Sequence, residues 1–203
     1  MSNGIAYPVF RTSDPAVALN VARQMVAFGV QPYSEVSVEA EVPTLAEVRR
    51  LRDALPEAWF RSDTAPFDLD LDPDVARSVP AGELPDDLTR VEEFLPFSVS
   101  QLDQPVGSIE GHFAAVTGPH PAEIHWSALM WPEAPERDLH GEGQHAEVTL
   151  LLNCESRALD ARTDTHLVLV HVRRGNRDGY EDRFAQWLAE QIGQKVIGPP
   201  QEA

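Results

Sequence analysis

The segments HAEVTLLLNCE at residues 145–155 and THLVLVHVRR at residues 165–174 decide the fold. Each is as long as a strand and rich in β-branched or large apolar residues, and an acidic turn at residues 160–164 separates them. Two further segments of this kind lie at residues 108–116 and 122–131. Together the four segments predict a meander of antiparallel strands in the second half of the chain.

A helix is predicted after the last of these strands. Asp178 is a suitable N-cap for this helix, and Gly193 is a suitable residue to end it. Between them, apolar residues recur at helical spacing: Tyr180, Phe184, Trp187, Leu188 and Ile192. We expect this helix to cover one face of the sheet with its apolar side.

The first part of the chain predicts alternating strands and helices. After a short strand at residues 5–10, Ser13 and Pro15 begin a helix that ends at Gly29. Residues 33–42, YSEVSVEAEV, then alternate polar and apolar side chains. This alternation is typical of a strand with one face in the core and one in water.

Thr44 and Glu47 have the spacing of a capping box, which predicts the start of a second helix. We therefore divide the chain into a β-α-β-α unit at residues 1–55, a connection at 56–97, and a meander with its terminal helix at 98–203. We expect these parts to form one domain. The predicted fold class is α+β: an antiparallel sheet of four to six strands, two N-terminal helices, and a C-terminal helix on one face.

The connection is acidic and rich in proline. Residues 56–96 contain six prolines and 11 acidic residues against three arginines, a local charge of 3 − 11 = −8. A structureless loop of this length is unusual in a compact domain, so we expect a short helix near residues 84–95. Acidic and aromatic side chains here are the candidate contacts for a basic partner: Trp59, Phe60, Phe67, Asp68, Asp70, Asp72 and Asp74.

All seven histidines lie between residues 112 and 171, within the predicted sheet and its turns. Separating each strand by side-chain parity puts apolar residues on one face and polar residues on the other. The polar face supplies the candidate catalytic residues: Glu110, His112, Glu123, His125 and Glu147. Imidazoles with carboxylates suit proton transfer or a metal such as zinc, and the candidate metal ligands are His112, His125 and His145. A solvated polar face without function is the alternative.

The strand at residues 165–174 is apolar in both phases. His171 shares one phase with two leucines, and His166 shares the other with three valines. The pattern alone does not decide which set faces the helix. Burial on both sides predicts a roof over part of the polar face, and the acidic connection is the candidate for that roof.

Charge and composition restrict the partners. The 203 residues include 16 basic and 33 acidic side chains, a formal charge of −17, which repels phosphate backbones and anionic membranes. We therefore expect no nucleic acid or membrane partner. No apolar run is long enough to span a bilayer and no secretory signal is visible, so we expect a cytoplasmic protein. Cys154 is the single cysteine, which excludes an internal disulfide and predicts a buried thiol.

Three functions remain open. The favoured hypothesis is an acidic module that docks a basic protein, as inhibitors and immunity-type proteins do. The second is a small enzyme, or a ligand-binding or metal-binding protein, that uses the histidine and glutamate face. The third is a structural subunit of a homo-oligomer. The sequence identifies no cofactor, and a divalent metal is the less favoured expectation. Contacts among the polar-face side chains would favour the second hypothesis, whereas dispersed side chains would oppose it.

Overall fold

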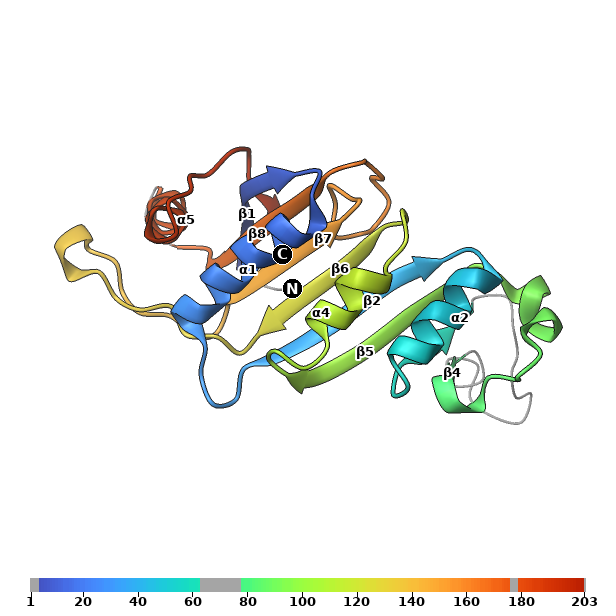
Figure 1. Ribbon diagram of the computed structural model, residues 1–203. Coiled ribbons are helices and arrows are strands. Elements are labelled where there is room, and N and C mark those ends of the chain that lie inside the picture. The colour runs from blue at the N-terminus through green and yellow to red at the C-terminus, as the bar shows by residue number, and fades with distance from the viewer. Residues whose placement is uncertain (1–3, 63–77, 176–178, 203) are drawn as a thin grey trace.

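A long antiparallel sheet forms the centre of the computed structural model, which describes residues 4–62, 78–175 and 179–202. Within these residues the sheet has nine strands in the order β4-β3-β5-β2-β6-β7-β8-β1-β9 (Figure 1). The strands are β1 (Gly4–Thr12), β2 (Glu35–Val42), β3 (Trp59–Arg61), β4 (Ser78–Pro80), β5 (Phe97–Pro105), β6 (Ala122–Ser127), β7 (Glu147–Leu152), β8 (His166–Arg173) and β9 (Gln201–Glu202). The helices are α1 (Pro15–Gly29), α2 (Leu45–Ala54), α4 (Glu110–Val116) and α5 (Tyr180–Gln191), with short 3-10 helices η1 (Ala81–Glu83), η2 (Leu88–Phe94) and η3 (Pro135–Arg137).

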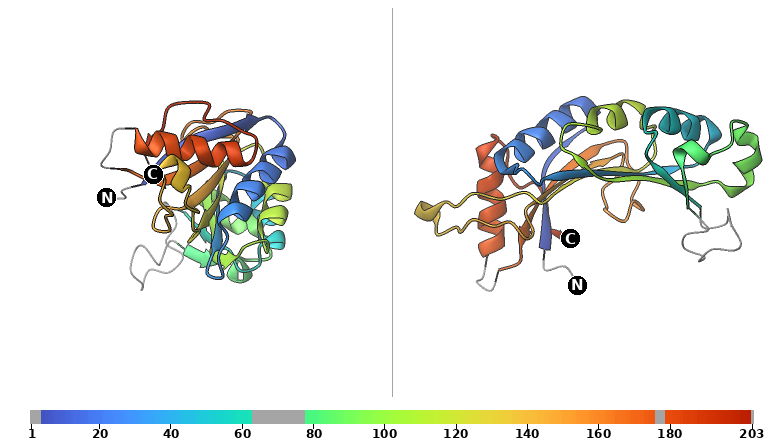
Figure 2. Two further views of the ribbon diagram at one scale, coloured as in Figure 1. Left: turned by 90° about the vertical axis from the view of Figure 1, so that its left-hand side faces the viewer. Right: turned by 90° about the horizontal axis from the view of Figure 1, so that it is seen from below.

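Helices α1, α4 and α2 lie in a row on one face of the curved sheet, and the opposite face is concave (Figure 2). The C-terminal helix α5 packs on β8 and β1. Its buried Phe184 and Leu188 belong to the same core as α1. The predicted cap of this helix, Asp178, lies outside the described residues. Among the described residues, no helix has the length and apolar character needed to cross a membrane.

Residues 4–54 form a strand, a helix, a strand and a helix in succession. Asp14 caps α1 in place of the predicted Ser13, because its carboxylate accepts hydrogen bonds from two backbone N–H groups of the first turn. Thr44 is the N-cap of α2, as predicted. The Thr44 hydroxyl accepts the backbone N–H of Glu47, and Thr44 Oγ1 lies 2.8 Å from that residue's carboxylate.

The sheet is larger than the predicted four to six strands, because all three parts of the chain contribute to it. The connection supplies β3 and β4, and its η2 lies within the segment where a short helix is predicted. The strand β5 crosses the expected boundary at residues 97 and 98. Its buried residues alternate with more exposed ones from Phe97 through Val99 to Gln101, which is the strand signal in its sequence.

The segment at residues 108–116 contains helix α4, and the prediction of a strand there is wrong. The Glu110 carboxylate stabilises the turn that precedes the helix, since it accepts the backbone N–H groups of Gly107 at 2.7 Å and Ile109 at 3.2 Å. The same carboxylate accepts the indole N–H of Trp126 at 2.9 Å. Glu110 is fully buried and joins α4 to β6, so it is a core residue and does not belong to a polar sheet face.

Strands β6, β7 and β8 form a meander with a register that places His125 opposite Thr149 and Glu147 opposite His171. The concave side of β7, β8 and β1 has a second, smaller core. Its buried residues are Ala6, Leu151, Cys154, Leu167 and Leu169, and Leu159 of the β7–β8 connection packs on them. The thiol of Cys154 is therefore buried, as predicted. Asn153 adopts a left-handed conformation (φ 54°) at the end of β7, and the connection that follows lies over the concave face (Figure 2).

We expect Glu110→Ala to lower the free energy of unfolding by about 3–5 kcal/mol, because it leaves the buried N–H donors of Ile109 and Trp126 without an acceptor and opens a cavity. Urea denaturation followed by circular dichroism measures the change. Glu93→Ala, at an exposed position of η2, is the matched control and should change stability by less than about 0.5 kcal/mol. Similar small effects of both substitutions would show that Glu110 does not hold α4 in place.

Candidate functional site

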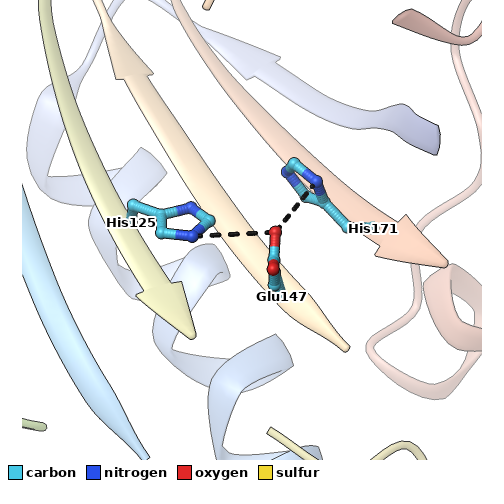
Figure 3. A group of neighbouring side chains, drawn as sticks. All are labelled: His125, Glu147 and His171. Atoms are coloured by element: carbon cyan, nitrogen blue, oxygen red, sulfur yellow. Dashed lines mark ion pairs between the residues drawn. The ribbon is translucent and has the colours of Figure 1, made fainter. Parts of the chain in front are cut away.

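Three side chains on the concave face converge at one point: His125 from β6, Glu147 from β7 and His171 from β8 (Figure 3). Nε2 of His125 lies 3.6 Å from Oε2 of Glu147, and Nδ1 of His171 lies 3.5 Å from the same oxygen. The three atoms lie within 4.8 Å of one another. His171 is buried, whereas His125 and Glu147 are partly exposed on the concave side. We call these three residues the triad.

Thr149 contacts both imidazole rings of the triad through their other nitrogen atoms. Its buried Oγ1 lies 3.0 Å from Nδ1 of His125 and 2.9 Å from Nε2 of His171. A hydroxyl has one proton, so it donates to at most one of these nitrogens, and the other imidazole must donate its own N–H to Oγ1. A neutral imidazole has a single N–H. At least one ring of the triad therefore presents a bare lone pair to Glu147.

Both histidines of the triad are neutral at pH 7. Burial lowers the pKa of His125 to about 4, with a smaller contribution from the positive charge of Arg157. Burial also holds the pKa of His171 well below its ordinary value of 6.5, and Arg157 and His125 add to this effect. Burial raises the pKa of Glu147, which Arg157 opposes. Neutral imidazole is the form of histidine that binds metal ions.

Nδ1 of His171 is the unsatisfied atom of the triad. It is buried, and within the part of the chain that the structure describes it has no hydrogen-bond partner. A protonated Glu147 could satisfy it only by an O–H···N hydrogen bond, which requires about 2.8 Å between the heavy atoms rather than 3.5 Å. Buried polar atoms without a partner are rare and costly in folded proteins, so this nitrogen indicates a missing ligand.

The distances from each imidazole to the Glu147 carboxylate suit a metal ion. Two ligand atoms on a tetrahedral zinc ion, each about 2.1 Å from the metal, lie about 3.4 Å apart. The two nitrogen–oxygen distances of the triad, 3.5 and 3.6 Å, are close to this value. Thr149 contributes the outer hydrogen bonds that usually orient metal-binding histidines. With three protein ligands, such a centre keeps a position for water or a substrate.

An ion pair lies beside the triad. Arg157, on the β7–β8 connection, donates from Nε and Nη2 to the Glu123 carboxylate at 3.4 and 3.3 Å. Glu123 in turn lies 3.9 Å from Nδ1 of His125. Burial raises the pKa of Glu123, and Arg157 opposes this shift through its charge and its hydrogen bond. The connection thus covers part of the concave face and also brings a positive charge to the edge of the triad.

The structure brings together two of the five candidate catalytic residues, His125 and Glu147, and places Glu123 beside them. The other two candidates do not join this group. His112 is exposed on α4, on the opposite face of the sheet (Figure 2), and Glu110 is buried beneath the same helix. Strand parity predicts both residues on the polar face of the sheet, but parity does not apply to a helical segment.

The second histidine of the triad is His171, which is not among the predicted metal ligands. The candidate ligand His145 precedes β7 and lies outside the triad, although its charge acts on the Glu147 carboxylate. The sequence does not decide on which face His171 lies, because β8 is apolar in both phases. The register of β7 and β8, which pairs Glu147 with His171, brings it into the triad, and this register is seen only in the structure.

The candidate partner contacts fall into three groups. Trp59 is half-exposed, at 50%, on the opposite side of β3 from Phe60. Phe60 is fully buried and makes an edge contact with Phe97, so its prediction as a surface contact is wrong. The remaining candidates lie outside the described residues: Phe67, Asp68, Asp70, Asp72 and Asp74.

Comparison of the chain with protein-family models, with curated proteins and with solved structures gave no match. Function is therefore inferred from the chemistry of the triad and its surroundings.

We expect His125→Gln to gain stability relative to the wild type as the pH falls from 6.5 to 4 in the presence of a chelator. The unfolded wild-type chain takes up a proton at this histidine near pH 6.5, whereas the folded chain does so only near pH 4, so acid favours unfolding across this window. The full difference is up to about 3 kcal/mol, since one pKa unit corresponds to about 1.4 kcal/mol. Urea denaturation at several pH values measures it.

The raised pKa values of Glu123 and Glu147 act in the opposite direction, but they do so in both proteins and largely cancel in the difference. His112→Gln, on the surface of α4, is the matched control. A stability difference between wild type and His125→Gln that does not change with pH would contradict the neutral, buried state of His125.

Proposed function

We propose that the protein is a metalloprotein in which His125, Glu147 and His171 bind one divalent transition metal of the zinc class. The single observation that supports this proposal most directly is the bare imidazole lone pair that faces a carboxylate oxygen at 3.5–3.6 Å. Two electron-rich atoms in this arrangement repel each other, and a cation between them turns the repulsion into two bonds. The convergence of these side chains also favours the enzyme or metal-binding hypothesis over a solvated face without function.

The donor set favours zinc, or iron in the same site, over magnesium and calcium. Two imidazole nitrogens and one carboxylate suit these transition metals, whereas magnesium and calcium prefer oxygen ligands throughout. Three protein ligands are typical of catalytic metal sites, and four are typical of structural ones. We therefore propose a metal-dependent enzyme whose open coordination position faces the concave side of the sheet. Activation of a water molecule for hydrolysis is the chemistry that such a centre supports.

Isothermal titration of metal-free protein with Zn²⁺ tests the proposal. We expect one Zn²⁺ per chain, and a loss of affinity of more than about 100-fold in His171→Ala and in His125→Ala. Thr149→Val keeps the side-chain volume but removes the hydroxyl that orients both rings, and should weaken binding by about 10- to 100-fold. His112→Ala is the matched histidine control and should bind as the wild type does. Wild-type protein that binds no Zn²⁺, or an equal loss in His112→Ala, would overturn the proposal.

A second candidate function is docking of a basic protein, which the charge of the concave face favours. Glu35, Glu39 and Glu41 alternate with buried residues along β2, on the same side as Glu123 of the neighbouring strand. The half-exposed Trp59 lies two strands away on β3. Complementary charge accelerates association, and an exposed tryptophan is a frequent anchor at protein interfaces.

We expect a tagged wild-type protein to capture a basic protein from a lysate of its source organism at about 0.1 M salt and to release it at about 1 M, where screening is much stronger. The triple substitution Glu35→Gln, Glu39→Gln and Glu41→Gln should abolish capture, and so should Trp59→Ala. Mass spectrometry identifies the captured protein. Capture that resists salt, or that the triple variant retains, would argue against electrostatic docking on the concave face.

A further inference from the structure

The charges around the triad do not balance once a metal ion is bound. The residues in contact are the triad with Glu123 and Arg157, and they carry two carboxylates, one guanidinium and two neutral imidazoles. Their formal charge is therefore 1 − 2 = −1. A divalent cation changes this to +1. The loaded centre thus has one positive charge more than its own side chains compensate.

This excess charge lies in a largely buried place. The side chains of Glu123 and His125 are 14% and 19% exposed, and that of His171 is 1% exposed. An uncompensated charge is expensive where water is scarce. Glu39 acts on Glu123, and Glu142 and His145 act on Glu147 with signs opposite to each other. Within the described residues none of the three makes a hydrogen bond or ion pair with the group, and Glu39 is exposed to screening by solvent. One negative charge at the open coordination position restores the balance.

Arg157 has donors left for such a ligand. A guanidinium has five N–H groups, and the contact with Glu123 uses groups on Nε and Nη2. The side chain is 28% exposed, so a molecule on the concave face can reach it. Guanidinium groups bind carboxylates and phosphates through paired, charge-assisted hydrogen bonds, which neutral groups do not reproduce with the same strength.

We infer that the open position of the metal centre binds a singly charged oxyanion, either a carboxylate or a phosphodiester, and that Arg157 selects for its charge. The inference rests on the proposed metal site and names its substrate class: molecules that present one such group to the metal. Arg157 belongs to the β7–β8 connection, so the segment that covers the triad would also determine which ligands it accepts.

Co²⁺-loaded protein provides the test, because the visible absorption of Co²⁺ depends on its ligands. Acetate and dimethyl phosphate are the anionic probes, and acetamide is the neutral counterpart of acetate. We expect at least one anion to shift the spectrum saturably in the wild type, and acetamide to bind at least about tenfold more weakly. Whichever anion binds more tightly identifies the carboxylate or the phosphodiester as the natural ligand group.

Arg157→Gln should reduce the preference for the anion over acetamide by about tenfold, because the loaded centre then has no excess positive charge. It should also bind Co²⁺ more tightly, since a neighbouring cation has been removed. Arg157→Lys keeps the charge and should retain the preference. Arg162→Gln, at an exposed position of the same connection, is the matched control and should behave as the wild type does.

The two proposals fail in different ways. Wild-type protein that does not bind Co²⁺ or Zn²⁺ overturns the metal site, and the inference falls with it. Protein that binds Co²⁺ but responds equally to acetate and acetamide, or to neither, overturns the oxyanion ligand and leaves the metal site standing. An unchanged anion preference in folded Arg157→Gln overturns the role of Arg157. If Arg157→Gln fails to fold by circular dichroism, a loss of preference in folded Arg157→Lys overturns selection by the charge of Arg157.

Discussion

The register of β6, β7 and β8 is the constraint on which both the core and the triad depend. Side chains alternate between the faces of a strand, so one register decides which residues meet the helices and which meet on the concave side. In this register Ile124, Val148 and Val170 lie in the main core, while His125, Glu147 and His171 lie opposite. A shift of one residue in this register would expose the valines and bury the glutamate. The burial of apolar side chains therefore fixes the register, and the register in turn brings the three polar side chains together.

Parity along the chain was enough to place His125 and Glu147 on one face, because β6 alternates throughout and polar and apolar side chains alternate in β7 from Glu147 to Leu150. It failed for Glu110, since the segment around it is helical and its carboxylate satisfies backbone N–H groups at the start of α4. Parity did not decide which face of the sheet His171 occupies, because β8 is buried on both sides and both of its faces are apolar. The size of the sheet was also beyond reach, since pairing between distant strands such as β1 and β8 leaves no local signal.

The connection between β7 and β8 changes what the triad can do. A polar sheet face in water would leave its histidines close to their ordinary pKa, but Leu159 packs on the second core and Arg157 reaches Glu123, so part of this face is removed from solvent. Burial makes both imidazoles neutral, so each ring has a single N–H. Because Thr149 contacts both rings, at least one ring must use its N–H to donate to the Thr149 hydroxyl. The expected roof was the acidic connection. The roof that the described residues show is a short segment next to the site in sequence, positioned by the left-handed backbone of Asn153.

The charge of the molecule and the charge of the loaded triad act on different steps of binding. A formal charge of −17, with Glu35, Glu39 and Glu41 on the concave face, attracts divalent cations toward the triad and repels anions from the surface around it. Salt screens this long-range field, whereas contacts inside the half-buried site are screened much less. An oxyanion therefore has to gain its affinity from direct contact with the metal and Arg157. The same acidic surface repels highly charged polyanions, so the oxyanion that we propose for this site is best carried by a small molecule with few charges.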